Sequence, residues 1–470
     1  MFATRATPDR DGSPISSGVW ILIVLALVSS AALAFWPSGR RDSRTMWLFA
    51  KPHQDTYTPI IDEWNRLRDP DIETILLGRA ALDRRLLSSF LSGTPAADLI
   101  EAERQNAARA FTGSLDAVGF VDLTDRIDAE GIRSRINPPS FAPWMSRGRI
   151  FGLPHDVHPV MLGYRADVFE AARIDVDSIR TWDDFERVLR PLMDTNGDGE
   201  PDRYLLNLWE TSTDHIEVLL LQAGGGFFDD AGRVIIDSPI NARVLARIVA
   251  WCQGPRRIAA DAPNFTASGN QLKAEGFVLS SFFPDWMCDV WKHELPQLAG
   301  KIKLMPLPAW DEGERRTSVW GGTMLGIPRS AVKSPEDFEE LWSFAKHLYL
   351  SKDLATDLYR SSGIVTPVVE FWSDPVFDEP DAYFASQPKG RMYIGLAPQV
   401  PARTSSPYNT LALSRVQDAL VQLSEETRRT RQYDEARLRE RASHYLKRAH
   451  DMVAAQIERN VFLSSAGGVP

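Results

Sequence analysis

The stretch Phe151-Gly152-Leu153-Pro154-His155-Asp156-Val157 opens the most informative segment of this chain. Gly-Leu-Pro is a turn that cannot continue a helix, because proline lacks an amide hydrogen and fixes its own backbone angle. The composition of residues 157–164 predicts a strand, and Pro159 places that strand at an edge or at a crossing between sheets. A short helix is expected at 167–172. The segment therefore reads as turn, strand and helix.

The same segment continues into Thr181-Trp182-Asp183-Asp184-Phe185. The Thr181 hydroxyl can accept a hydrogen bond from an amide of the first helical turn, so Thr181 is predicted to be the N-cap of a helix. The carboxylates of Asp183 and Asp184 are stabilising beside the positive end of that helix.

Upstream, apolar runs of strand length alternate with stretches of helical spacing. Strands are predicted at 45–50, 72–77 and 97–101, and helices at 56–68 and 80–91. This alternation is typical of a parallel, doubly wound α/β sheet, in which ligands bind outside the carboxyl ends of the strands. Lys51, His53, Glu101 and Glu103 are therefore expected near the mouth of a crevice.

These motifs, with Pro306-Leu307-Pro308 and Trp320-Gly321-Gly322 downstream, resemble in order and spacing those of the family 1 extracellular solute-binding proteins. The resemblance implies a fold of the periplasmic binding protein type II kind, with two doubly wound α/β lobes joined by a hinge. Its first lobe would comprise residues 45–153 and 308–365. Its second lobe would comprise residues 158–302 and 366–470.

Sugars present polar edges and C–H faces, so a sugar site needs planar aromatic rings beside carboxylates or amides. The chain has 14 Trp, although tryptophan is also ordinary core material. The crevice and the resemblance together predict the following ligand-binding residues: Lys51, His53, Glu101, His155, Asp156, Trp209, Asp285, Trp286, Trp320, Gly321, Gly322 and Thr366. Arg165 stands where the family pattern expects Asn, so no ligand role is predicted for Tyr164 or Arg165.

The loop Asp194-Thr195-Asn196-Gly197-Asp198-Gly199-Glu200-Pro201-Asp202 places oxygen ligands at alternate positions. Asp194, Asn196, Asp198, Glu200 and Asp202 could hold a structural calcium ion, with glycine at the sixth position where a sharp turn is needed. The twelfth position is Leu205 instead of the glutamate of an EF-hand, and acidic Asp-Gly loops are also plain turns. Both interpretations stay open.

Residues 18–36 contain no charge and are long enough to span a bilayer. Ala32-Leu33-Ala34 resembles a signal-peptide cleavage site, so the segment is either a membrane anchor or a signal segment, preceded by a disordered, cytoplasmic stretch at 1–17. In an exported protein Cys252 and Cys288 could form a disulfide, and the alternative is two buried free thiols. The net charge of −10 argues against nucleic acid as a partner.

The resemblance implies a binding protein rather than an enzyme, with no cofactor apart from the possible calcium ion. It would capture a carbohydrate by hinge closure and deliver it to the permease subunits of an ABC transporter. The expected location is the extracytoplasmic face of the bacterial inner membrane. Two alternatives are a membrane-tethered ligand sensor using the same module, and a glycan-acting enzyme, which would need two carboxylates at a fixed separation.

Overall fold

The computed structural model describes residues 20, 21, 24, 43–68, 70–92 and 96–460. Apart from Trp20, Ile21 and Val24, the predicted apolar span 18–36 and the segment 1–17 lie outside the described residues. No helix within the described part of the chain is long and apolar enough to cross a membrane.

The first lobe is built on a five-stranded sheet in the order β2-β1-β3-β12-β6. Its strands are β1 (Ser43–Leu48), β2 (Asp71–Leu76), β3 (Leu99–Glu103), β6 (Leu153–Pro154) and β12 (Thr323–Gly326). β1 runs parallel to β2 and β3, as the alternation predicts, whereas β12 runs antiparallel to β3 and β6. The helices of this lobe include α2 (Lys51–Leu67), α3 (Arg79–Ser92), α4 (Arg104–Arg109), α5 (Thr124–Ala129), α12 (Pro335–Tyr349) and α13 (Lys352–Ser362).

The second lobe has its own five-stranded sheet, in the order β11-β7-β10-β8-β9. Its strands are β7 (Val160–Arg165), β8 (Tyr204–Asn207), β9 (Ala259–Ala260), β10 (Val278–Pro284) and β11 (Ile302–Pro306). All seven residues of β10 are buried, as expected for a central strand covered on both faces. The helices here include α6 (Ala166–Ala171), α7 (Trp182–Leu189), α8 (Thr213–Gln222), α9 (Pro239–Cys252), α10 (Ala267–Glu275), α11 (Met287–Glu294) and α14 (Lys389–Leu396).

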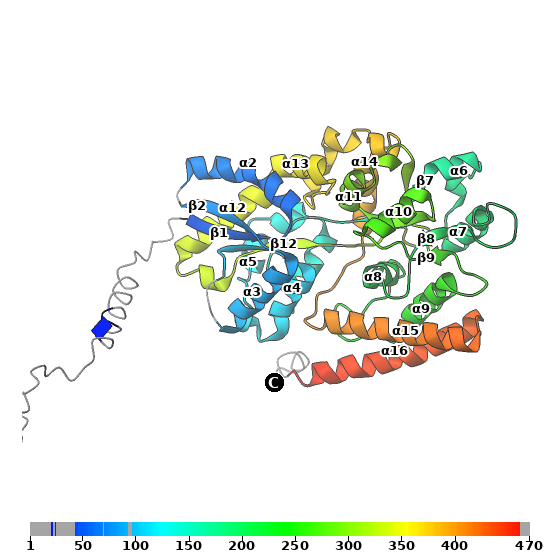
Figure 1. Cartoon of the computed structure of the whole chain (residues 1–470). Helices are drawn as coiled ribbons and strands as arrows, with labels where there is room; N and C mark the ends of the chain where they lie inside the picture. Colours follow the sequence, from blue (N-terminus) through cyan, green and yellow to red (C-terminus); the bar gives the residue numbers. More distant parts are fainter. Residues whose placement is uncertain (1–19, 22–23, 25–42, 69, 93–95, 461–470) are drawn as a thin grey trace, which may run out of the picture.

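The C-terminal helical region consists of two helices, α15 (Asn409–Thr430) and α16 (Glu435–Glu458). The chain turns between them at Arg431, whose φ of 54° lies in the left-handed region. The two helices run side by side beneath α8 and α9 in Figure 1, and α15 also contacts α4 of the first lobe. A small hairpin, β4 (Met145–Ser146) with β5 (Arg149–Ile150), completes the described strands.

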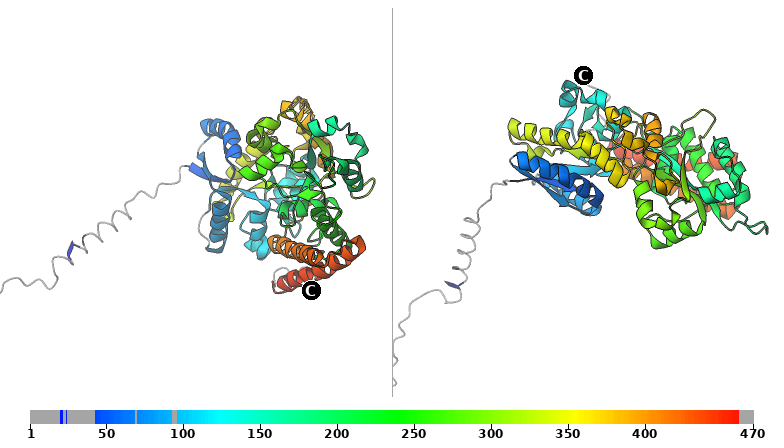
Figure 2. Two further views of the ribbon diagram at one scale, coloured as in Figure 1. Left: turned by 45° about the vertical axis from the view of Figure 1, so that its right-hand side comes forward. Right: turned by 90° about the horizontal axis from the view of Figure 1, so that it is seen from above.

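Three segments carry the chain between the two lobes, which lie side by side in the right-hand view of Figure 2. The first crossing, residues 155–159, joins β6 to β7, and the second leads from β11 back to β12. The third follows α13, where Ile364 packs in the core of the first lobe and Val365 in that of the second. Three crossings therefore connect the two lobes.

Residues 307–320 of the second crossing stay with the second lobe. Leu307, Trp310 and Val319 belong to its hydrophobic core, and Ser318 Oγ donates a hydrogen bond of 2.7 Å to the carbonyl of Val218. The chain enters the first lobe again at β12, later than the predicted start at residue 308. The other predicted lobe boundaries stay predictions.

The predicted helix cap at Thr181 and the predicted place of Pro159 can both be compared with the structure. The Thr181 hydroxyl accepts from the Asp184 amide at 3.1 Å, and the Asp184 carboxylate accepts from the Thr181 amide, which makes a complete capping box at α7. Pro159 lies at the first crossing, one of its two predicted places. It does not mark an edge, because β7 lies between β11 and β10.

Candidate functional site

A buried ion-pair relay occupies the end of the first crossing. His158 Nδ1 lies 2.5 Å from Asp285 Oδ1, and His158 Nε2 lies 3.0 Å from Asp156 Oδ2. Burial alone would lower the pKa of His158, but the two carboxylates outweigh it and raise that pKa to about 10. His158 is therefore a cation at neutral pH. The two ion pairs also hold His158 at a φ of 51°, a region that non-glycine residues seldom adopt.

Asp285, at the end of β10, joins this relay to the third crossing. Its Oδ2 accepts a hydrogen bond of 2.7 Å from the Val365 amide, and its Oδ1 accepts one of 2.9 Å from the Trp286 amide. The side chain is fully buried. One carboxylate thus ties two of the three crossings to the central strand of the second lobe.

A second buried group lies at the start of the first crossing. Glu101, on β3, has no exposed surface; its Oε1 lies 2.9 Å from His53 Nδ1, and its Oε2 accepts from Tyr57 Oη at 2.7 Å and Tyr349 Oη at 3.1 Å. Burial raises the pKa of Glu101, but His53 and the hydrogen bonds outweigh it, so the net shift is downward. The His155 ring lies 4.7 Å from that of His53, centroid to centroid, and burial lowers the pKa of His155.

A buried arginine–glutamate clasp connects the two lobes. Arg104 Nη2, at the start of α4, lies 2.7 and 3.0 Å from the two carboxylate oxygens of Glu217 on α8. Arg403 also pairs with Glu217 and donates a 2.6 Å hydrogen bond to the Gly321 carbonyl. Burial, reinforced by Arg403, lowers the pKa of Arg104 to about 10, yet it stays charged at neutral pH. A cavity of about 220 Å³ lies beside the clasp, lined partly by Gly224, Gly225 and Gly226.

A row of aromatic rings follows the second lobe up to the crossings. Neighbouring ring centroids along the row lie 5.2 to 6.3 Å apart, in the order Trp209, His215, Trp320, Trp286, Phe265. Trp286 packs against the hydrophobic cores of both lobes. Phe265 is 58% exposed, has a φ of 61° and lies nearly parallel to Trp286 at an interplanar angle of 11°. An exposed phenyl ring in a strained backbone geometry is unusual for a residue with only a packing role.

Gly321 allows this row to meet the relay. Its φ of 113° favours glycine, and a Cβ there would lie 2.6 Å from His158 Cδ2 and 3.0 Å from Trp286 Nε1. Trp286 Nε1 in turn donates a 3.0 Å hydrogen bond to the Trp320 carbonyl. The predicted Trp-Gly-Gly motif therefore lies where the aromatic row, the relay and the clasp converge.

The structure brings most of the predicted ligand-binding residues to this region, and these residues differ in how exposed their side chains are. Those that are buried are His53, Glu101, His155, Asp156, Asp285, Trp320 and Thr366. Trp209, Trp286, Gly321 and Gly322 are half-buried, and Lys51 is exposed and paired with Asp55. All twelve remain predictions as solute contacts.

Several residues of the region were not predicted. The relay adds His158, the buried group around Glu101 adds Tyr57 and Tyr349, the clasp adds Arg104, Glu217 and Arg403, and the aromatic row adds His215 and Phe265. The only sequence signal among them was His158, which follows Asp156 by two residues. Most of the others pair with residues far along the chain, as Arg104 does with Glu217, so spacing could not have found them.

In the structure, carboxylate oxygens of the predicted calcium loop accept hydrogen bonds from backbone amides of the same loop. Asp194 Oδ1 and Oδ2 accept from the Gly197 and Gly199 amides at 2.6 and 2.9 Å, and Asp202 Oδ2 accepts from the Thr195 amide at 2.7 Å. These are the bonds of a plain acidic turn, and calcium binding there stays a prediction.

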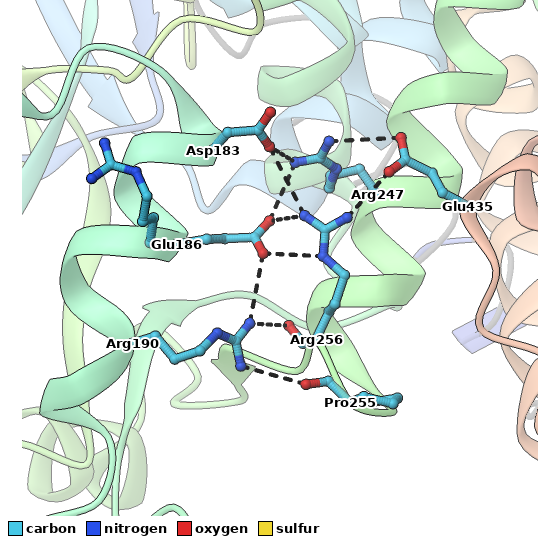
Figure 3. A pocket seen from close by; sticks show the side chains of 8 residues that line it. Asp183, Glu186, Arg190, Arg247, Pro255, Arg256 and Glu435 are labelled. Atoms are coloured by element: carbon cyan, nitrogen blue, oxygen red, sulfur yellow. Dashed lines mark hydrogen bonds and ion pairs between the residues drawn. The ribbon is translucent and has the colours of Figure 1, made fainter.

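A surface depression lies away from the crossings. Its volume is about 510 Å³, and Arg247 and Arg256 approach Asp183, Glu186 and Glu435 within it (Figure 3). Arg256 Nη2 lies 2.8 Å from Glu186 Oε1, and Arg256 Nη1 lies 3.1 Å from Glu435 Oε2. These ion pairs attach the start of α16 to α7, so we interpret the depression as structural.

Known proteins resemble this chain both in sequence family and in fold. The sequence model of the family described as bacterial extracellular solute-binding protein matches residues 50–354. The arabinooligosaccharide-binding protein of Halalkalibacterium halodurans is 24% identical over 347 residues, which cover 72% of this chain and 74% of that protein. Its namesake from Bacillus subtilis is 25% identical over 334 residues, covering 69% and 74%.

Solved structures share the fold at lower identity. The sugar-binding protein MalE from Xanthomonas citri superposes with a TM-score of 0.68 at 14% identity, covering 88% of this chain and 98% of that one. Maltose-bound MalE3 of T. maritima gives a TM-score of 0.64 at 19% identity, covering 86% and 99%. The predicted two-lobed α/β binding-protein fold is confirmed.

Proposed function

Because this chain belongs to the bacterial extracellular solute-binding protein family, whose members bind solutes and are not enzymes, we propose that it captures an oligosaccharide for an ABC importer. The family places it on the extracytoplasmic side. Two relatives carry the name arabinooligosaccharide-binding protein, which favours a short arabinose-containing chain as solute. The importer's permease subunits would be its partners, and the segment 18–36 would anchor it or direct its export.

The observation that carries the proposal is the exposed Phe265 ring lying over Trp286. The row from Trp209 to Phe265 presents several rings in succession, which suits a ligand made of several sugar units. Aromatic rings pack against the C–H faces of sugars, while carboxylates accept hydrogen bonds from the sugar hydroxyls. Glu103 supplies a carboxylate from the first lobe, and Asp214 supplies one from the second. Burial raises the pKa of Glu103, and the charges of Glu101 and Asp214 add to that rise.

Hinge closure provides the mechanism. A solute that contacts the aromatic row on one lobe and the first lobe on the other stabilises the closed arrangement over the open one. The clasp between Arg104 and Glu217 joins the lobes in the structure described here. In this scheme the buried relay of Asp156, His158 and Asp285 holds the crossings about which the lobes turn.

Isothermal titration calorimetry with arabinotriose, maltotriose and free arabinose tests the proposal. Wild-type protein is expected to bind arabinotriose most tightly, and Phe265→Ala to weaken binding about 10- to 100-fold, because burying a phenyl ring contributes about 1.5–3 kcal/mol. Since Phe265 is 58% exposed, its loss should leave the free energy of unfolding within about 0.5 kcal/mol of wild type.

Leu67→Ala is the matched control, because Leu67 is 76% exposed at the end of α2 and belongs to no part of the aromatic row. Equal affinities for wild type and Phe265→Ala would contradict the proposed site. Absence of binding to all three sugars would contradict the solute class. In that case a thermal-shift screen with other solutes follows, in which a ligand at one hundred times its dissociation constant stabilises by about 2.7 kcal/mol.

A further inference from the structure

The side chains of His53, Glu101 and His155 form a compact group of metal-ligand type. Each offers one donor atom, the three atoms lie within 4.8 Å of one another, and all three side chains are buried. They come from α2, β3 and the first crossing. We propose that this trio, whose members were also predicted as solute contacts, binds a zinc ion, an inference that does not depend on the solute proposed above.

His155 gives the second, independent observation. Its Nδ1 lies 3.1 Å from Asp156 Oδ2, whereas its Nε2 is buried and has no hydrogen-bond partner. With the Nδ1 proton donated to Asp156, Nε2 carries a free lone pair. A ligating histidine usually donates its other ring N–H to a carboxylate, and Asp156 takes that role here. A buried nitrogen without a partner costs free energy, so a cation at Nε2 would satisfy it.

Glu101 is oriented for the same purpose. Its Oε2 is held by the hydroxyls of Tyr57 and Tyr349, which leaves Oε1 facing His53 Nδ1 at 2.9 Å. Zinc would take the place of the proton between these two atoms, and that proton would move to the other ring nitrogen of His53. The carboxylate would then balance part of the charge of the ion.

The donor set favours zinc over calcium or magnesium, because two imidazole nitrogens and one carboxylate suit zinc, while calcium and magnesium prefer oxygen ligands only. Tetrahedral zinc with bonds of about 2.0–2.1 Å holds its ligand atoms about 3.4 Å apart. The most distant donor atoms, within 4.8 Å of one another, would have to approach by about 1.4 Å at most, whereas His53 Nδ1 and Glu101 Oε1, 2.9 Å apart, would separate by about 0.5 Å. The bound ion would fasten the first crossing to α2 and β3.

The test uses the purified full-length chain, stripped with a chelator and then mixed with an equimolar amount of zinc chloride. After gel filtration, atomic emission is expected to find about one zinc per chain, and the melting temperature is expected to rise relative to the stripped protein. Cobalt(II) in place of zinc is expected to give the intense visible absorption of a tetrahedral ion. His155→Asn and Glu101→Gln are each expected to weaken zinc binding at least tenfold.

His293→Asn is the matched control, because His293 is an exposed histidine beside Asp289 on α11 and should retain wild-type zinc binding. Circular dichroism establishes that each variant is folded. Three outcomes would overturn the proposal: no zinc retained by wild type, equal retention by folded His155→Asn, or loss in the control. Should both site variants fail to fold, the cobalt spectrum of wild type decides, and the weak absorption of an octahedral ion would refute the site.

Discussion

Replacing Asp285 by asparagine should destabilise the protein strongly, although the change removes only a charge. In the structure its carboxylate accepts from three donors, the Val365 and Trp286 amides and His158 Nδ1. Asparagine keeps one acceptor oxygen and turns an amide group toward the remaining donors. The buried His158 cation is left with Asp156 as its one carboxylate partner.

The magnitude follows from the His158 pKa. A rise from 6.5 to about 10 corresponds to at most about 5 kcal/mol, shared between two carboxylates, so the charge of Asp285 accounts for about 2–3 kcal/mol. An unsatisfied buried amide adds about 1 kcal/mol. We expect Asp285→Asn to lower the free energy of unfolding by about 3–4 kcal/mol at pH 7, within the range for broken buried ion pairs.

The pH dependence has a definite sign. The pKa of His158 is higher in the folded than in the unfolded protein, so the stabilisation is complete below pH 6.5 and disappears as the pH rises through about 10. Urea denaturation followed by tryptophan fluorescence at several pH values between 6 and 10 measures this. The difference between wild type and Asp285→Asn should be largest at pH 6 and shrink toward pH 10.

Asp289→Asn is the matched control, because Asp289 also faces a histidine, His293 at 3.3 Å, but on the exposed surface of α11. Its cost should stay below about 1 kcal/mol. A cost for Asp285→Asn no larger than that of the control would refute the reasoning. So would a difference that stays constant or grows between pH 7 and 10.

Two further predictions concern the interlobe clasp and the thiols. Arg104→Ala leaves Glu217 buried with Arg403 as its remaining guanidinium partner, and should lower the free energy of unfolding, measured by urea denaturation, by about 3 kcal/mol. Arg109→Ala, at a partly exposed ion pair on the same helix, should lower it by less than about 1 kcal/mol. Equal losses for the two variants would contradict a buried clasp. Cys252 and Cys288 are free thiols, and burial raises the pKa of Cys288 to about 12. Two thiols per chain should therefore react with a thiol reagent in denaturant without reductant, and should react very slowly in the native protein. If no thiol reacts in denaturant, the two cysteines form a disulfide.

Local rules in the sequence predicted much of the fold. The strands and helices of residues 43–103 and the capping box at Thr181 follow from apolar periodicity and cap chemistry, which act within a few residues. The order of loose motifs along the chain predicted the family. The same rules did not find the turn at Arg431, because nothing nearby in the sequence marks a left-handed residue there.

The tertiary structure alone decided the partners. His158 and Asp285 are 127 positions apart, and Arg104 and Glu217 are 113 apart, so their pairing depends on which strands and helices pack together. Exposure was equally undetermined: His155 and Asp285 are polar residues that the packing of two lobes buries, while the same packing leaves Phe265 in solvent. Local sequence sets backbone preference over a few residues, whereas burial and charge pairing are properties of the whole packed chain.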